Sequence, residues 1–268
     1  MSDSILTRTP PPADARVAYG SDSLHFADLR LPTGDGPFPA VVVIHGGYWR
    51  SRYTLDHSGH HCTALTALGF ATWSIEYRRV GNPGGGWPGT FHDVAAGAAA
   101  LFAHADRLGI DPERIVVTGH SAGGQLASWL ASVGNIDPAS PIRAAPLPFR
   151  AVAPLAGVLD LVEGVGMGLG NGAIPDFLGG GPEEFPDRYA AASPVALAPS
   201  PVPHVLIHGE EDETVPIAIS ERYRDATTAA GGEVRLIPIP GAGHFEVIDP
   251  ESAAWRVVAE TIRSLVDR

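Results

Sequence analysis

The sequence contains no lysine: all 18 of its basic residues are arginine. A pyridoxal aldimine, a Schiff-base aldolase and a P-loop phosphate site each need a lysine amine at the reacting centre, so these chemistries are excluded. The single cysteine, Cys62, has no partner for an internal disulfide. No apolar run approaches the roughly 18 residues of a membrane span, and the N-terminal residues do not resemble a signal peptide. We therefore expect a cytoplasmic protein with no membrane partner.

Positive charge is also scarce, because 30 acidic residues give the chain a formal charge of −12. Binding to a nucleic-acid backbone needs a concentrated basic surface, so a nucleic-acid partner is not expected. Hydrophobic residues make up 44% of the chain and charged residues 18%, which is typical of a globular protein. A chain of 268 residues can form one large core. We predict a single domain over residues 1–268, and a homodimer is left open.

Short apolar runs, separated by glycine and proline, alternate with segments of helical period. Residues 40–44 (AVVVI) are apolar at every position, which is typical of a parallel strand covered by helices on both faces. Further strands are expected over residues 24–31, 70–77, 114–118, 151–155, 204–208 and 234–239, and helices over residues 93–108, 122–133, 217–230 and 250–266. This alternation predicts an α/β fold with a mostly parallel central sheet and helices on both faces.

Two segments depart from the alternation. Residues 1–20 contain three consecutive prolines and are predicted to form an extended N-terminal arm. Residues 159–199 are rich in glycine and lack a long periodic element, which favours a cap or lid insertion. The glycines at 164, 166 and 168 resemble a dinucleotide fingerprint, but neither a convincing strand nor a helix flanks them, so no cofactor is expected.

The strongest chemical signal is the sequence GHSAGG over residues 119–124, which lies between an expected strand and an expected helix. G-x-S-x-G in that context is typical of a nucleophile elbow, a sharp turn that presents the serine hydroxyl above the sheet edge. Glycine is needed on both sides because a side chain there would clash with neighbouring backbone. Ser121 is therefore the candidate nucleophile.

A serine hydroxyl needs a base to take its proton and a carboxylate to orient that base. His244 lies in a loop just after the last expected strand, where an imidazole can reach back over the sheet. Four consecutive acids follow the strand at residues 204–208, and Asp212 is the predicted triad acid among them because of its spacing after Gly209. Asp160 is the reserve candidate, and the other three acids are predicted to be solvated charges.

The sequence HGGYW at residues 45–49 directly follows the AVVVI run. Backbone N–H groups in such a turn can stabilise the oxyanion that forms during acyl transfer. The predicted donors are the amides of Gly47, Tyr48 and Ala122. Tyr48, Trp49 and Trp87 are the candidate substrate-binding residues, because loops at the carboxyl ends of parallel strands usually bind the ligand.

The order Ser121, Asp212, His244, with GHSAGG and an upstream HGG turn, resembles the α/β-hydrolase fold from about Leu24 onward. The HGGYW form and the GHFE sequence around His244 are similar to motifs of kynurenine formamidases (arylformamidases) and of small carboxylesterases of the hormone-sensitive-lipase type. The resemblance implies a serine hydrolase that forms an acyl-enzyme. It favours N-formylkynurenine or a similar aryl formamide as substrate, with short-chain carboxylic esters as the alternative.

Two other interpretations fit the sequence less well. The cluster His57, His60, His61 and Cys62 has nitrogen and sulfur ligands at close spacing, but serine chemistry needs no metal and no carboxylate pairs with the cluster, so no metal site is expected. A non-catalytic ligand-binding protein on a hydrolase fold would usually lack a triad member, whereas here all three positions are filled.

Overall fold

A computed structural model describes residues 3–267. These residues contain an eight-stranded sheet in the order β1-β2-β4-β3-β5-β6-β7-β8. The strands are β1 (Ala15–Ala18), β2 (Phe26–Arg30), β3 (Phe38–Ile44), β4 (Ala71–Ile75), β5 (Ile110–His120), β6 (Val152–Leu155), β7 (His204–Gly209) and β8 (Val234–Ile239). β1 and β2 are antiparallel to their neighbours, and every pairing from β4 to β8 is parallel. This is the α/β-hydrolase fold that the sequence predicts.

The α-helices are α1 (Gly59–Ala67), α2 (Gly89–His104), α3 (Ala122–Ala131), α4 (Leu161–Gly166), α5 (Ala173–Leu178), α6 (Pro186–Ala192), α7 (Ala218–Ala229) and α8 (Trp255–Val266). Short 3-10 helices occur at η1 (Asp3–Leu6), η2 (Leu55–Ser58), η3 (Asp106–Leu108), η4 (Val133–Asn135), η5 (Pro194–Leu197) and η6 (Glu246–Ile248). Among residues 3–267, no helix has both the length and the apolar character needed to cross a membrane.

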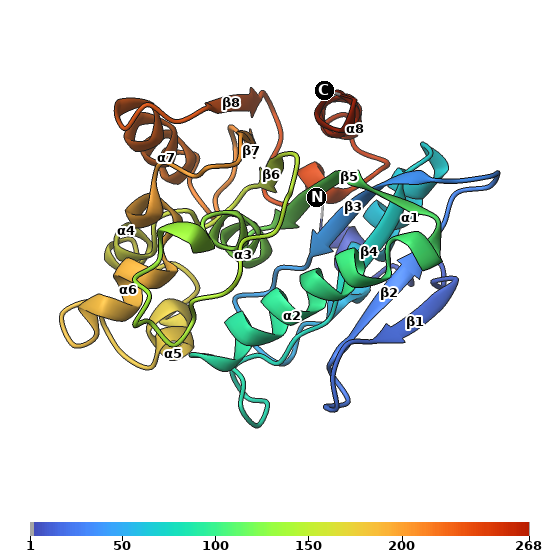
Figure 1. The fold of residues 1–268 in the computed structure, drawn as a ribbon. Helices are drawn as coiled ribbons and strands as arrows, with labels where there is room; N and C mark the ends of the chain where they lie inside the picture. The colour runs from blue at the N-terminus through green and yellow to red at the C-terminus, as the bar shows by residue number, and fades with distance from the viewer. Residues whose placement is uncertain (1–2, 268) are drawn as a thin grey trace.

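The sheet is covered on both faces, as the apolar run of β3 indicates. Val42 and Ile44 belong to the core that also contains side chains of α2, α3 and α7, whereas Val41 and Val43 belong to the core that contains side chains of α1 and α8. Alternate residues of one strand therefore belong to different cores, which explains why every position is apolar. The same division of helices between the two faces is visible in Figure 1.

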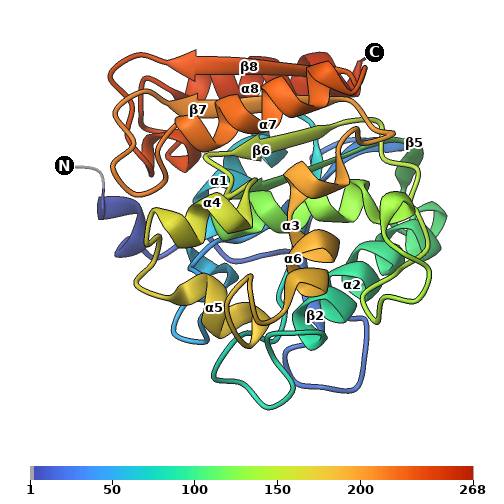
Figure 2. The ribbon, with the colours of Figure 1, turned by 90° about the vertical axis from the view of Figure 1, so that its left-hand side faces the viewer.

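The segment predicted as a cap, residues 159–199, contains the short helices α4, α5, α6 and η5. These helices lie together beside α3 and are shown in yellow to orange in Figure 2. The arm predicted as extended over residues 1–20 differs from the expectation in its described part, because it includes η1 and the edge strand β1. Residues 1–2 lie outside the described residues.

The N-terminal arm is anchored by both apolar and charged contacts. Ile5 is fully buried in the core that contains α1 and α8. Arg8 pairs with Asp249 at 2.5 Å and with Glu251 at 2.6 Å. These contacts bring η1 to the end of the sheet at which the parallel strands finish.

Candidate active site

Ser121 lies in a tight turn between β5 and α3, with φ of 56° and ψ of −119°. A positive φ is unfavourable for a residue with a side chain, and such strain is characteristic of a nucleophile elbow. The flanking glycines make the turn possible. A Cβ at Gly119 would lie 2.1 Å from the carbonyl oxygen of Gly123, and one at Gly123 would lie 2.0 Å from the carbonyl oxygen of Ile44. The steric reason inferred from the sequence therefore holds at both positions.

Asp212 and His244 are in direct contact. The Nδ1 atom of His244 lies 2.7 Å from Oδ2 of Asp212, and both side chains are buried. Oδ1 of Asp212 accepts hydrogen bonds from the backbone amides of Thr214 and Val215, each at 2.8 Å. These bonds fix the plane of the carboxylate, so it holds the imidazole in one orientation with Nε2 on the far side of the ring.

The charge of Asp212 is stabilised despite its burial. Burial alone would raise the pKa of this carboxyl, but hydrogen bonds from His208 and His244 and the Val215 amide outweigh it and hold the pKa well below its usual range. His208 Nε2 lies 3.3 Å from Oδ2 of Asp212. The carboxylate is therefore ionised throughout the range in which a histidine base would work.

Ser121 and His244 line the same cavity, which has a volume of about 270 Å³. Its other lining residues are Leu6, Gly47, Tyr48, Tyr53, His57, His120, Thr214 and Phe245. The structure thus brings together the three residues that the sequence singled out from the loops after β5, β7 and β8.

His120 packs against His244, the proposed base. Its ring lies 4.5 Å from the ring of His244, and its Nε2–H donates to the backbone oxygen of His244 at 2.8 Å. Burial, followed by the neighbouring imidazoles of His244 and His57, lowers the pKa of His120 well below its usual value. The ring is therefore neutral and packs against His244 without adding charge.

The HGG turn lies directly against the elbow. A Cβ at Gly46 would come within 2.7 Å of the backbone oxygen of His120 and 3.2 Å of the Cβ of Ser121. Gly47 and Tyr48 follow with φ of 110° and 54°. The amides of Gly47, Tyr48 and Ala122 donate no hydrogen bond to another atom of residues 3–267, so they are available to a ligand.

Of the three predicted substrate-binding residues, only Tyr48 lines this cavity. Burial raises the pKa of its phenol, so the hydroxyl keeps its proton. The Trp49 side chain lies in the core instead: it is only 1% exposed, stacks on Phe177 at 4.7 Å and donates to Gln125. Trp87 lines a separate cleft of about 630 Å³, together with Arg188.

Asp160, the reserve acid, and His61 of the histidine-rich cluster have structural roles in the fold. Asp160 caps α4 by accepting from the amide of Glu163, and it pairs with Arg222 at 3.2 Å. His61 is fully buried against Trp255, and burial lowers its pKa to about 4. Within residues 3–267, no three His, Cys, Asp or Glu side chains are grouped so that they could hold a metal ion.

Comparison with known proteins identifies the family. The model of the family described as BD-FAE matches residues 27–226. This chain belongs to the BD-FAE family.

Relatives of this BD-FAE chain include two esterases of Mycobacterium tuberculosis. Esterase LipQ is 30% identical over 84% of this chain and 54% of the relative, and esterase LipC is 27% identical over 90% and 64%. The chain therefore spans about half to two thirds of the length of these relatives. The comparisons support the esterase side of the sequence-based resemblance and do not show a likeness to kynurenine formamidases.

Solved structures agree on the fold. A truncated carbohydrate esterase from gut microbiota superposes with a TM-score of 0.82 at 23% identity, covering 97% of this chain and all of that chain. A thermophilic esterase from Thermogutta terrifontis gives a TM-score of 0.76 at 23% identity, with 96% and 93% covered. The TM-scores establish the shared α/β-hydrolase fold, and identities this low support no statement beyond the fold.

Several residues that line the cavity around Ser121 and His244 were not predicted from the sequence. Leu6 comes from η1, more than a hundred residues from the elbow, and the burial of Ile5 together with the ion pairs of Arg8 brings it to the cavity. Tyr53 and His57 follow the HGGYW motif closely in the sequence. Their proximity to the motif could have predicted that they line the cavity. Phe245 follows the base directly and forms an apolar wall beside it.

Proposed function

We propose that this chain is a serine carboxylesterase that acts on small acyl esters. The observation that carries the proposal is the 2.7 Å contact between His244 and Asp212 in a cavity that His244 shares with Ser121. Neighbouring carboxylate, imidazole and hydroxyl groups at a strained elbow are the requirements for nucleophilic acyl transfer. The esterase relatives support the same reaction class.

In the proposed reaction, Oγ of Ser121 attacks the ester carbonyl carbon while Nε2 of His244 takes the hydroxyl proton. Asp212 stabilises the resulting imidazolium. The amides of Gly47, Tyr48 and Ala122 stabilise the oxyanion of the tetrahedral intermediate. When the intermediate collapses, the proton passes from His244 to the departing alcohol, and an acyl-enzyme remains.

Deacylation reverses these roles. A water molecule gives a proton to His244 and attacks the acyl carbonyl, and a second tetrahedral intermediate forms at the same oxyanion site. Its collapse returns the proton to Oγ of Ser121 and releases a carboxylic acid. No cofactor takes part in either half of the proposed cycle.

The size of the cavity supports a short acyl group. About 270 Å³ has to hold the scissile group and part of its substituents, with Leu6 and Phe245 as apolar walls. A formyl group also fits so small a space, and the HGGYW sequence favours an aryl formamide as the second candidate substrate. The ester is placed first because of the esterase relatives.

A substrate panel on wild type and Ser121→Ala tests the proposal. The panel contains nitrophenyl acetate, nitrophenyl butyrate and N-formylkynurenine. We expect kcat/KM for the acetate to fall by about three orders of magnitude or more in the variant. Ser128→Ala is a matched control, because Ser128 lies on α3, is buried and makes no side-chain hydrogen bond within residues 3–267.

Three results would contradict the proposal. Unchanged ester turnover by a folded Ser121→Ala variant would remove Ser121 from the reaction. A wild-type preference for N-formylkynurenine over both esters would make the protein an arylformamidase with the same residues. A protein that binds these compounds without turning any of them over would be a ligand-binding member of the fold.

A further inference from the structure

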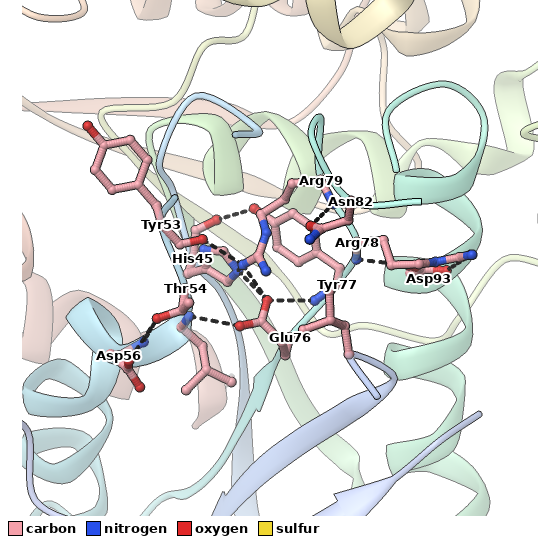
Figure 3. Close-up of polar contacts among 12 residues, drawn as sticks. His45, Tyr53, Thr54, Asp56, Glu76, Tyr77, Arg78, Arg79, Asn82 and Asp93 are labelled. Atoms are coloured by element: carbon pink, nitrogen blue, oxygen red, sulfur yellow. Dashed lines mark hydrogen bonds and ion pairs between the residues drawn. The ribbon is translucent and has the colours of Figure 1, made fainter. Parts of the chain in front are cut away.

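A buried charged cluster lies at the base of the loop that carries the HGG turn (Figure 3). It consists of His45, Glu76 and Arg79, which are 0%, 1% and 1% exposed. His45 directly follows β3, and the other two follow β4, the neighbouring strand. None of the three lines the cavity that contains Ser121. Charges so deeply buried are costly unless they are paired and hydrogen-bonded, so each contact in the cluster matters.

Glu76 is surrounded by donors. Its Oε1 accepts from the amide of Tyr77 at 2.9 Å and from Nη1 of Arg79 at 2.5 Å, and it lies 3.0 Å from Nε2 of His45. Its Oε2 accepts from the amide of Leu55 at 3.3 Å. Burial would raise the pKa of this carboxyl, but the charges and hydrogen bonds of His45 and Arg79 outweigh it and lower the pKa. Glu76 is therefore ionised.

The hydrogen-bond partners of His45 favour a proton on both ring nitrogens. Nδ1 lies 2.8 Å from the carbonyl oxygen of Gly46, which can only accept. Nε2 faces the ionised Glu76 and also lies 3.2 Å from Nη1 of Arg79. Nη1 has two hydrogens, and its two shorter contacts, to the backbone oxygen of Tyr53 at 2.6 Å and to Glu76 at 2.5 Å, use both. Nε2 must then donate to Glu76.

We infer that His45 is an imidazolium whose buried ion pair with Glu76, a carboxylate that it shares with Arg79, positions the oxyanion loop, residues 45–55. Two cations and one anion leave the cluster with a net charge of +1. The catalytic part of this inference rests on the proposed function, whereas the charge on His45 does not. His45 is a positioning residue, because it acts through the backbone that follows it.

The cluster holds the oxyanion loop at both ends. Glu76 bonds His45 at its start and the Leu55 amide at its end, and Arg79 bonds the backbone of Tyr53. Between these points, Tyr48 and Trp49 both have a φ of 54°, a strained conformation that needs support from its surroundings. Fixing the loop in this way keeps the free amides of the HGG turn aimed at the cavity, and the net positive charge favours an oxyanion there.

The other titratable groups facing His45 are uncharged. The ring of His57 lies 5.7 Å away, and burial, followed by the charge of His45, lowers the pKa of His57 to about 3. Tyr77 stacks on His45 at 4.3 Å and its hydroxyl donates to the backbone oxygen of His45. Burial raises the pKa of the Tyr77 phenol far above its usual range, so it does not neutralise the imidazolium.

Nitrogen NMR of histidine-labelled wild-type protein measures the charge on His45 without any assay of activity. With the resonances assigned through the backbone, we expect both ring nitrogens of His45 to carry a proton at pH 8, above the ordinary histidine pKa of about 6.5. A His45 ring with one bare nitrogen at pH 8 would overturn the inference. In that case Nε2 accepts from Arg79 instead.

Glu76→Gln tests the positioning role. We expect His45 to lose its second proton at pH 8, and kcat for nitrophenyl acetate to fall by about 10- to 100-fold, while KM stays within about threefold. Asp93→Asn is the matched control, because Asp93 is 2% exposed and pairs with Arg78 and His25 away from the oxyanion loop. The control should lose stability but keep its kcat.

The outcomes separate the two proposals. A folded Glu76→Gln protein with wild-type kcat would overturn the positioning role. If Glu76→Gln does not fold, His45→Gln replaces it, because this change keeps a donor toward Glu76 and removes the charge. If the wild type carries the imidazolium but hydrolyses no ester, the proposed function fails while the charge assignment stands.

Discussion

Gly46→Ala separates the steric requirement of the site from its chemistry. The substitution adds one methyl group, and Gly46 has no positive φ that would exclude alanine. The added Cβ would lie 2.7 Å from the carbonyl oxygen of His120 and 3.2 Å from the Cβ of Ser121. Contacts under about 3 Å do not persist, so the HGG turn and the elbow have to move apart by several tenths of an ångström. This movement widens the space between the two sides of the oxyanion site.

The expected effect is mainly on kcat. A misplacement approaching 1 Å can reduce a rate by about 100-fold, which corresponds to about 2.7 kcal/mol of transition-state stabilisation. KM should change little, because the amides act most strongly on the charge of the transition state. Overpacking of this kind should also cost about 1–3 kcal/mol of stability.

The assay compares nitrophenyl acetate hydrolysis and thermal unfolding for wild type, Gly46→Ala and Gly166→Ala. Gly166 ends α4, has no atom within 4 Å of an added Cβ and has no positive φ, so its substitution controls for the loss of a glycine. A folded Gly46→Ala protein whose kcat is within twofold of the control would refute the reasoning.

Three further predictions concern the ionisation of Asp212, the burial of His61 and the acyl-chain specificity set by Leu6. Despite burial, hydrogen bonds from His208 and His244 keep the pKa of Asp212 below its usual value, so its ionisation stabilises the fold fully above about pH 4 and less as the pH falls further. The stability difference between wild type and Asp212→Asn, measured by urea unfolding, should narrow below pH 4, and a constant difference would contradict this. Burial lowers the pKa of His61 to about 4, so protonation favours the unfolded state as the pH falls from about 6.5 to 4. His61→Phe should therefore abolish about 3 kcal/mol of acid destabilisation over that interval, whereas an unchanged pH profile would show that His61 titrates normally. Leu6→Ala removes one apolar wall of the cavity and should raise kcat/KM for nitrophenyl hexanoate relative to acetate by about tenfold. An unchanged ratio would place the acyl chain elsewhere.

The sheet was predictable where local pattern and tertiary environment agree. The run at residues 40–44 required burial on both faces, and β3 has it. β1 could not be found in the same way, because it is largely exposed and forms only by pairing with β2. Helix α1, which begins at Gly59, is not among the predicted helices, and it is held by the burial of Cys62 and Leu65.

The candidate site was predictable to the extent that it is encoded in short motifs. The elbow and the HGG turn are local. A Cβ would come within 3 Å of backbone atoms at Gly46, Gly119 and Gly123, and within 3 Å of the Tyr53 side chain at Gly47. The orientation of Trp49 is not local, because it depends on a stacking partner in α5, Phe177. The contribution of Leu6 depends on the docking of η1 through Ile5, which no spacing in the sequence reveals.

The central claim is that the hydroxyl of Ser121 is activated as a nucleophile. Treatment of the folded protein with a fluorophosphonate, followed by intact mass measurement and peptide mapping, tests this claim most directly. The account predicts one adduct per chain, located on Ser121, with loss of ester hydrolysis in proportion to the fraction modified. An adduct on a different serine, or full hydrolytic activity with no adduct, would contradict it.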